Sequence, residues 1–308
     1  ESPEIEIGNS SGEEQLEKFR YVDGELWMAG VDSLGSDEQV HFPLIGGNMY
    51  THQSSGWAKH NTVPGGEHVH DVVWWNDAAW SVGSGADNRP EFETGQIHRY
   101  LWRSLSRGES WMKINRQPFP IPGNGDTRWV NLLPQDDNLY IFGYEYNWVE
   151  SEIGVANARF NGWDLVPLNS ADSLMNIYAS GTLPLTEKLG LIWGVDVGGE
   201  ERINQVWVSK RGQREELQVL SGRTLIDATL NPETNELLLL SHSGNTYGEG
   251  PSNSELQIHL ASIDSPENAE LLLSWNSTFN IRCVAFFDGS LFLGTTSGDV
   301  LRAKGSLN

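Results

Sequence analysis

The chain has 308 residues, with 42 acidic and 20 basic side chains and a formal net charge of −22. Nucleic acids and anionic membranes attract proteins through Lys and Arg that neutralise phosphate, so this charge argues against both as partners. No run of about 18 apolar residues occurs, which argues against a membrane-spanning helix. The single cysteine, Cys283, permits no disulfide within the chain, and we interpret it as a small buried apolar side chain.

The first predicted element is the segment 3–8, PEIEIG, which alternates polar and apolar residues and so predicts a strand. The residues around it are polar and acidic. Such an opening is compatible with a mature chain whose targeting segment has been removed, and we expect an extracellular or periplasmic location.

One phrase then recurs six times along the chain: an apolar strand, a tight polar turn, and a second apolar strand that usually closes on Gly. The copies span 19–30, 72–83, 131–143, 181–194, 228–241 and 284–295. The large apolar residues that anchor their second strands are Trp27, Trp80, Tyr140, Leu191, Leu238 and Phe292, at intervals of 53, 60, 51, 47 and 54. A period near 50 built from hairpins is typical of a β-propeller.

We therefore predict an all-β fold, a six-bladed β-propeller of four-stranded antiparallel blades that forms a single domain over 1–308. The predicted third and fourth strands are 39–51 and 57–62, 96–104 and 110–116, 155–160 and 163–168, 203–210 and 215–220, and 256–263 and 270–275. The sixth blade has no fourth strand of its own. We predict that 3–8 completes it and closes the ring, because closure leaves no open sheet edge.

The connections divide the propeller into two faces. Turns inside the hairpins are short, at 23–24, 76–77 and 288–289, whereas the connections after the second strands are long, at about 31–38, 84–95, 144–153, 195–202 and 241–253. Long loops on a rigid scaffold commonly carry function. We therefore expect the ligand, a carbohydrate or a protein, at the long-loop face.

Blade two brings His68 and His70 to that face, with both side chains on the same side of the strand. Two imidazoles could hold a divalent metal, calcium or zinc, or could transfer protons, and Asp71 could orient one of them. They could equally form hydrogen bonds between blades. No third ligand can be identified, so the sequence assigns no definite cofactor.

Arg128 and Arg282 occupy roughly equivalent positions in their blades, and their guanidinium groups suit a carboxylate or sulfate. Salt bridges to Asp126 or Asp71 are the alternative. The ends of second strands add Glu145 and Asp196, which we group with Asp71 and the two arginines as substrate-binding residues.

The run 144–148, Tyr-Glu-Tyr-Asn-Trp, has aromatic side chains that suit the face of a sugar. We interpret Tyr144 or Tyr146 as a proton donor or base, beside His68 and His70.

Residues 104–111, Ser-Leu-Ser-Arg-Gly-Glu-Ser-Trp, resemble the Asp box (BNR repeat) Ser-x-Asp-x-Gly-x-Thr-Trp of sialidase-like propellers. Ser106 stands in place of the Asp, Ser110 stands in place of the Thr, and 52–57 is a poorer second copy. The resemblance implies the propeller fold and a structural turn between the third and fourth strands. The arginine triad, the Tyr/Glu pair and the FRIP segment of sialidases have no match in this chain, so the resemblance does not imply sialidase activity.

Together these features predict a secreted, carbohydrate-active propeller that binds an anionic polysaccharide at the long-loop face and cleaves it as a lyase or hydrolase. One alternative is a non-catalytic propeller that acts as a protein- or glycan-binding adhesion module of a surface assembly. Another is a metal-stabilised structural component of such an assembly. The sequence decides neither whether the protein is an enzyme nor its oligomeric state.

Overall fold

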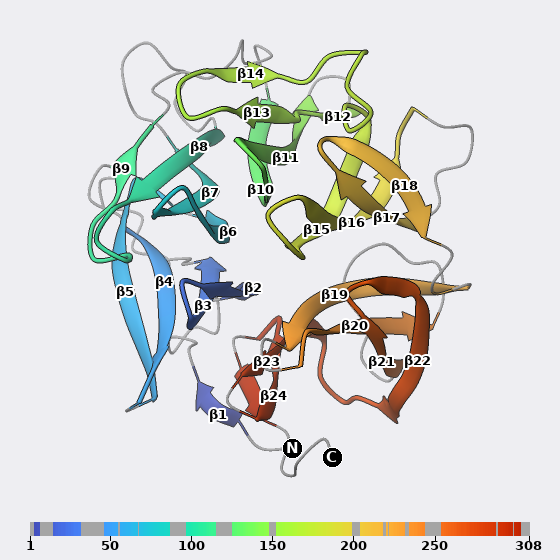
Figure 1. The fold of residues 1–308 in the computed structure, drawn as a ribbon. Helices are drawn as coiled ribbons and strands as arrows, with labels where there is room; N and C mark the ends of the chain where they lie inside the picture. The colour runs from blue at the N-terminus through green and yellow to red at the C-terminus, as the bar shows by residue number, and fades with distance from the viewer. Residues whose placement is uncertain are drawn as a thin grey trace.

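The computed structural model describes residues 3–6, 15–31, 46–54, 56–66, 68–86, 97–114, 125–147, 152–198, 204–217, 220, 222–231, 234–243, 254–287, 289–297 and 299–302. All regular elements in these ranges are strands, and none of the ranges holds a helix that could cross a membrane. Figure 1 looks along the axis of a ring of six antiparallel blades. The predicted fold class is confirmed.

The strands of the first three blades follow the chain from the centre of the ring outward. Blade one contains β2 (Gln15–Val22), β3 (Glu25–Val31), β4 (Gly46–Gln53) and β5 (Gly56–Pro64). Blade two contains β6 (His68–Trp75), β7 (Ala78–Ala86), β8 (Ile97–Ser104) and β9 (Met112–Lys113). Blade three contains β10 (Gly125–Gln135), β11 (Asn138–Asn147), β12 (Glu152–Val155), β13 (Ala158–Phe160) and β14 (Leu165–Pro167).

The last three blades have four strands each. Blade four contains β15 (Ile177–Pro184), β16 (Leu189–Asp196), β17 (Asn204–Lys210) and β18 (Gln213–Leu217). Blade five contains β19 (Arg223–Asn231), β20 (Glu236–Ser243), β21 (Glu255–Ser262) and β22 (Ser265–Asn276). Blade six contains β23 (Ile281–Phe287), β24 (Ser290–Thr295), β25 (Asp299–Arg302) and β1 (Pro3–Glu6).

Three details differ from the prediction. The sheet of blade three has a fifth strand, because β12 pairs with the end of β11. β9 has only two residues. A bridge between Val31 and His68 joins β3 to β6, so the sheets of blades one and two are continuous. The long connections lie mostly outside the described residues.

Every innermost strand carries a β-bulge at the same place. The six bulged residues are Glu17, His70, Val130, Ser180, Ile226 and Arg282. In every blade the apolar anchor of the sequence repeat pairs with the residue three positions after the bulge, as Trp27 pairs with Arg20 and Phe292 with Ala285. The repeat found in the sequence is therefore also a repeat of strand register.

The bulges explain why several copies of the repeat close on glycine. Gly83, Gly143 and Gly194 each pair with the residue just before the bulge of their blade. A Cβ atom added at these glycines would lie 1.9, 2.1 and 2.1 Å from a backbone carbonyl oxygen of the inner strand. Only glycine permits this close approach of the two strands. Blades five and six have Ser241 and Thr295 at the paired position.

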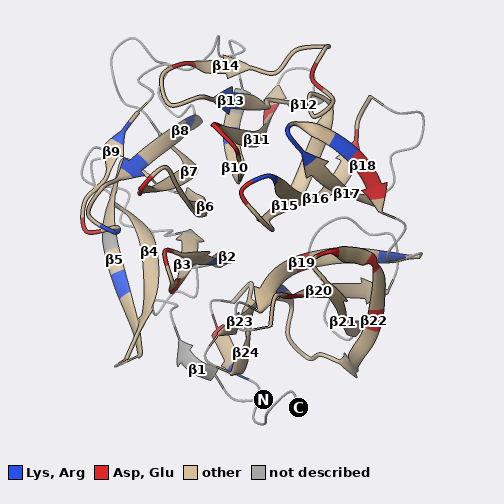
Figure 2. Ribbon diagram, in the orientation of Figure 1, with Lys and Arg blue, Asp and Glu red and all other residues tan. Residues whose placement is uncertain are grey.

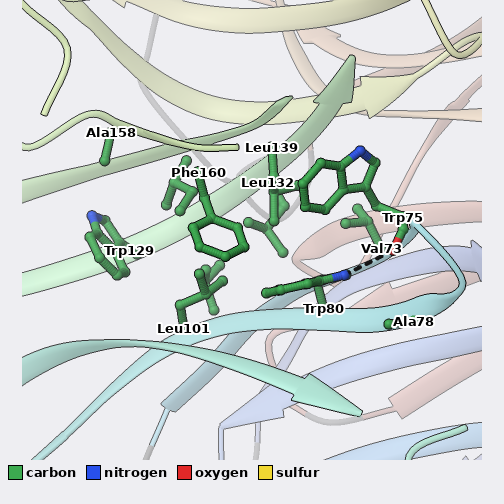
Figure 3. Packing of buried hydrophobic residues seen from close by; sticks show 12 residues of the cluster. Val73, Trp75, Ala78, Trp80, Leu101, Trp129, Leu132, Leu139, Ala158 and Phe160 are labelled. Carbon is green, nitrogen blue, oxygen red and sulfur yellow. Dashed lines mark hydrogen bonds between the residues drawn. The ribbon is translucent and has the colours of Figure 1, made fainter. Parts of the chain in front are cut away.

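The described hydrophobic residues form six buried clusters, one between each pair of neighbouring blades. Figure 3 shows the cluster between blades two and three, where Trp75, Trp80 and Phe160 meet and the indole of Trp80 donates to the Trp75 carbonyl oxygen at 2.9 Å. Trp74 packs partly buried against the cluster between blades one and two. Trp74 and Trp75 are thus part of the interblade core, and the predicted burial of Cys283 is confirmed, in the cluster between blades six and one.

β1 is the outermost strand of blade six and pairs antiparallel with β25 (Figure 1). This is where the sequence placed the segment 3–8, although residues 7 and 8 lie outside the described residues. That β1 closes the ring and thereby stabilises the whole propeller stays a prediction.

Candidate functional site

The inner strands of blades two, three and four each carry a polar residue at an equivalent position near the start of the strand. His68, Arg128 and Tyr178 each lie two residues before the bulge of their strand and are half-buried. Tyr144, on the second strand of blade three, stacks against Tyr178 with ring centroids 5.7 Å apart. His68 also stacks on His70, with a centroid separation of 5.8 Å and an interplanar angle of 2°. No role was predicted for Tyr178 from the sequence.

The charges of these groups act on one another. Burial first, and then His70 and Arg128, lower the pKa of His68 to about 3. Burial first, and then Tyr144, raise the pKa of Tyr178 to about 12, although Arg128 opposes the shift. At neutral pH His68 is therefore a neutral imidazole and Tyr178 keeps its phenolic proton.

Glu17, at the bulge of blade one, extends this group around the axis. Its carboxylate lies 3.7 Å from His70 Nδ1 and 2.6 Å from Arg282 Nη2. Burial raises the pKa of Glu17, but the charge of Arg282 and the interaction with His70 outweigh it and hold the pKa at about 2. We call Glu17, His68, His70, Arg128, Tyr144, Tyr178 and Arg282 the mouth cluster.

Nε2 of His70 and Oγ of Ser180 are buried near the mouth cluster and have no hydrogen-bond partner among the described residues. Both residues occupy bulge positions, as Glu17 and Arg282 do. Buried polar atoms are usually satisfied by protein, water or a ligand. Glu17 occupies the same position of the repeat as His70 and Arg282. That shared position is the signal by which the sequence could have identified it.

The residues one position after the bulges form a second, deeper layer. The carboxylate of Asp71 accepts from Arg20 Nε at 2.8 Å and from the backbone N–H of Leu132 at 2.8 Å, and it is 3.5 Å from Lys18 Nζ. Lys18 also donates to the side chain of Asn131. Figure 2 shows part of β2, which carries these basic residues, in blue at the centre of the ring.

The contacts of Asp71 bear on the two roles predicted for it, which are orienting a histidine and binding substrate. The carboxylate beside His70 is Glu17 and not Asp71, because Asp71 is fully buried and holds Arg20 and Lys18. Its contact to the Leu132 N–H joins blade two to blade three. Asp71 therefore has a structural role between blades, and the substrate-binding role predicted for it remains untested.

Asp227 occupies the same deep position in blade five, and it joins blade five to blade six by accepting from the Val284 N–H at 2.9 Å. Its Oδ1 has no hydrogen-bond partner in the described part of the chain. Burial raises the pKa of Asp227 to about 6, against the opposing charge of Arg20. Burial, and then Asp227, raise the pKa of the neighbouring Cys283 thiol, which disfavours a reactive thiolate.

The remaining predicted residues are placed as follows. Arg282 lies at a bulge and Arg128 lies two residues before one, so the two are not equivalent as the sequence suggested. Arg282 is ion-paired with Glu17, which was not among the acidic partners considered from the sequence, and the side chain of Asp126 lies outside the described residues. Asp196 is ion-paired with Arg214 of the outermost strand of blade four.

The run 144–148 is only partly described. Glu145 is half-buried and is close enough to Arg99 to influence its pKa, and Tyr146 is half-buried beside it on β11. Trp148 lies outside the described residues. The structure therefore brings together His68, His70, Arg128, Tyr144 and Arg282, while the roles predicted for all of these residues stay predictions.

The described residues add no third metal ligand to His68 and His70. Across the described ranges, no three His, Cys, Asp or Glu side chains gather as a set that could hold a metal ion. The described part of the mouth cluster offers the two stacked imidazoles and one carboxylate already paired with Arg282.

The turn at 104–111 connects β8 to β9, as its resemblance to an Asp box predicts for a turn between third and fourth strands. Ser104 Oγ accepts from the Gly108 N–H and Ser106 Oγ accepts from the Ser110 N–H, each at 2.9 Å. The serine that stands in place of the Asp thus still holds the turn. In the other segment, 52–57, Ser55 lies outside the described residues.

No protein-family model and no curated protein sequence matches the chain. Among solved structures it is similar to the Hadza microbial sialidase Hz136, with a TM-score of 0.55 and 14% identity over 95% of this chain and 65% of the sialidase. It is also similar to the GH74 enzyme of Niastella koreensis, with a TM-score of 0.51 and 10% identity over 96% of this chain and 52% of the enzyme. The chain spans less than two thirds of either protein. At these identities the likeness shows the fold alone: the protein is a six-bladed β-propeller that shares its architecture with sialidase and GH74 propellers.

Proposed function

We propose that the protein binds an anionic polysaccharide at the mouth cluster, outside the cell. The observation that carries the proposal is the row formed by His68, Arg128 and Tyr178 at equivalent positions of three consecutive blades, all partly exposed. The row presents one cation, one neutral imidazole and one phenol at the same strand position of neighbouring blades.

The chemistry of the row suits an acidic sugar. The guanidinium of Arg128 can bind a carboxylate in a bidentate manner. The ring faces of Tyr144 and Tyr178 suit the apolar face of a pyranose, and the neutral His68 can exchange hydrogen bonds with its hydroxyls. Arg282 contributes less net charge, since Glu17 neutralises it at 2.6 Å.

Of the two cleavage reactions, the mouth cluster favours β-elimination over hydrolysis. Most glycoside hydrolases use two carboxyl groups, whereas the carboxylate of the mouth cluster, Glu17, is buried against Arg282. In an elimination, a base removes the proton α to the sugar carboxylate, a C=C bond forms, and the C–O bond to the leaving sugar breaks. Arg128 would stabilise the charge that develops on the carboxylate, and a tyrosine would protonate the leaving oxygen. His68 could act as the base, but its low pKa makes it a weak one.

A glycan array followed by calorimetry with uronate-containing oligosaccharides tests binding, and the ultraviolet absorbance of unsaturated products tests cleavage. We expect Arg128→Ala to weaken binding of acidic glycans at least tenfold, which corresponds to about 1.4 kcal/mol. Arg107→Ala is the matched control, because Arg107 is an exposed arginine in the β8–β9 turn, paired with Asp23. No binding by any acidic glycan, or equal loss in both variants, would contradict the proposal.

Binding without product formation would favour the alternative of a non-catalytic glycan-binding module. The double variant His68→Ala/His70→Ala separates the two, because it should abolish turnover in a lyase while Arg128 still supports binding. Retained turnover in that variant would exclude both histidines from the chemistry.

A further inference from the structure

The contact between Glu17 and His70 links the bulges of blades one and two within the mouth cluster. Oε1 of Glu17 lies 3.7 Å from Nδ1 of His70, and the two side chains are only 11 and 8% exposed. Oε2 of Glu17 accepts from Arg282 at 2.6 Å, which holds the carboxyl group in place and leaves Oε1 for His70. The pKa of Glu17 is about 2, so the carboxylate is charged at neutral pH.

This carboxylate determines which nitrogen of His70 carries the proton. The tautomer of an imidazole is set by the partner of one nitrogen, and a carboxylate favours a proton on the nitrogen that faces it. His70 should therefore carry its proton on Nδ1, with the lone pair on Nε2. Nε2 is buried and has no hydrogen-bond partner among the described residues. Because buried polar atoms usually have a partner, the unpaired Nε2 indicates a point at which a ligand contacts the mouth cluster.

The other histidine of the mouth cluster is placed differently, although its ring stacks on that of His70 at 5.8 Å. Burial first, and then the charges of His70 and Arg128, disfavour a proton on His68, and Glu17 has the smallest influence of those acting on it. His70 lies directly beside the carboxylate. A positive charge that forms on His70 is therefore balanced by Glu17, whereas one that forms on His68 is opposed by Arg128.

We propose that His70, through Nε2, is the base of the elimination and that Glu17 is the residue that positions it. The inference rests on the proposed function and names the base within that same site. A base that is oriented by a third group is a general arrangement for proton transfer in enzymes.

In the elimination, the lone pair of Nε2 takes the proton α to the sugar carboxylate, and the electrons of that C–H bond form the C=C bond. The C–O bond to the leaving sugar breaks, and its oxygen takes the phenolic proton of a tyrosine. His70 is then an imidazolium beside Glu17, and the tyrosine is a phenolate. Water carries the proton from the imidazolium back to the tyrosine, and both groups return to their starting states.

The tautomer of His70 tests the inference without a substrate. Long-range proton–nitrogen correlation spectra of the protein, isotope-labelled in its histidines, distinguish protonated from unprotonated ring nitrogens. The variant His70→Gln identifies the signals of His70, because they disappear from its spectrum. At neutral pH we expect a proton on Nδ1 and none on Nε2. A proton on Nε2 instead would overturn the inference, even in a protein that cleaves glycans.

The kinetics of Glu17→Gln test the positioning role. The variant keeps the size of the side chain but removes its charge, so kcat should fall about 10- to 100-fold. Binding of acidic glycans should be kept or strengthened, because Arg282 loses the charge that neutralises it. A merely structural Glu17 would weaken both. Glu255→Gln is the matched control, since it also removes a carboxylate paired with an arginine, Arg223 at 3.5 Å, and its kcat should equal that of the unaltered chain.

A double variant shows whether Glu17 acts through His70. In a chain that already has His70→Gln, adding Glu17→Gln should lower the residual kcat no further, because the group that Glu17 positions is gone. An equal fall in kcat with and without His70 would overturn the positioning role. These results are distinct from a failure of the proposed function, which would appear as a chain that binds no acidic glycan while its His70 still carries the proton on Nδ1.

Discussion

Replacing Asp71 by alanine should destabilise the propeller severely. Asp71 is fully buried and its carboxylate balances two buried cations, Arg20 at 2.8 Å and Lys18 at 3.5 Å. It also accepts the Leu132 N–H of the next blade. Removing one partner of a buried ion pair typically costs about 3–5 kcal/mol, because the remaining charge is left without compensation. Here two cations lose that compensation, so we expect the upper part of this range.

The assay is thermal and urea unfolding followed by circular dichroism. At roughly 2 °C per kcal/mol for a chain of this length, the melting temperature of Asp71→Ala should fall by about 8–10 °C. The matched control is Asp227→Asn, at the equivalent position of blade five. A fall of less than about 1 kcal/mol in Asp71→Ala would refute the reasoning, since a buried pair cannot be removed so cheaply.

The control has its own expected sign. The pKa of Asp227 rises from 3.8 in the unfolded chain to about 6 in the folded protein. The folded state therefore binds more protons between these values, and the stabilisation that protonated Asp227 gives at low pH is lost as pH rises through about 6. At neutral pH Asp227→Asn should be neutral or stabilising, and its stability should vary less over this window than that of the unaltered chain.

Three further outcomes are expected. Deleting residues 1–10 removes β1 from the edge of blade six and should lower the melting temperature, and an unchanged melt would show that β1 is not needed for closure. The pKa of His68 is about 3 in the folded protein and 6.5 in the unfolded chain, so on acidification the unfolded chain binds the proton first. The free energy of unfolding should therefore fall as the pH is lowered between these values. In urea unfolding, His68→Gln should show a smaller fall. Gly143→Ala should cost about 1–3 kcal/mol in the same assay, since its Cβ would meet the Arg128 carbonyl oxygen at 2.1 Å, and an undiminished stability would mean that the strands can separate there.

The blades could be predicted from the sequence because each hairpin repeats its own local pattern. Trp27 and Phe292, at opposite ends of the chain, occupy the same register in their blades, as the repeat anchors indicated. The alternation of the strands and the short turns depends on neighbours along the chain, so it is visible without tertiary information. His68, His70 and Arg128 could be assigned to one face for the same reason.

The partners of these residues could not be predicted in this way. Glu17 contacts Arg282 although 265 positions separate them, and Arg20 donates to the Thr182 carbonyl oxygen at 2.5 Å over a separation of 162. Such contacts exist only because six blades close around an axis, which places their inner strands within side-chain reach of one another. The bulge at His70 changes the register of its strand by one residue. Asp71 therefore contacts Arg20, whereas His70 lies beside Glu17.

The sequence by itself determined the number of blades and the register of the hairpins, because these follow from local periodicity and turn chemistry. Only the tertiary structure decided which charges neutralise one another. It paired Arg282 with Glu17 and Asp71 with Arg20 and Lys18, while His68, Arg128 and Tyr178 stand together at the mouth. Coulomb interactions depend on the distance between two charges in space, and the separation of two residues along this chain does not predict that distance.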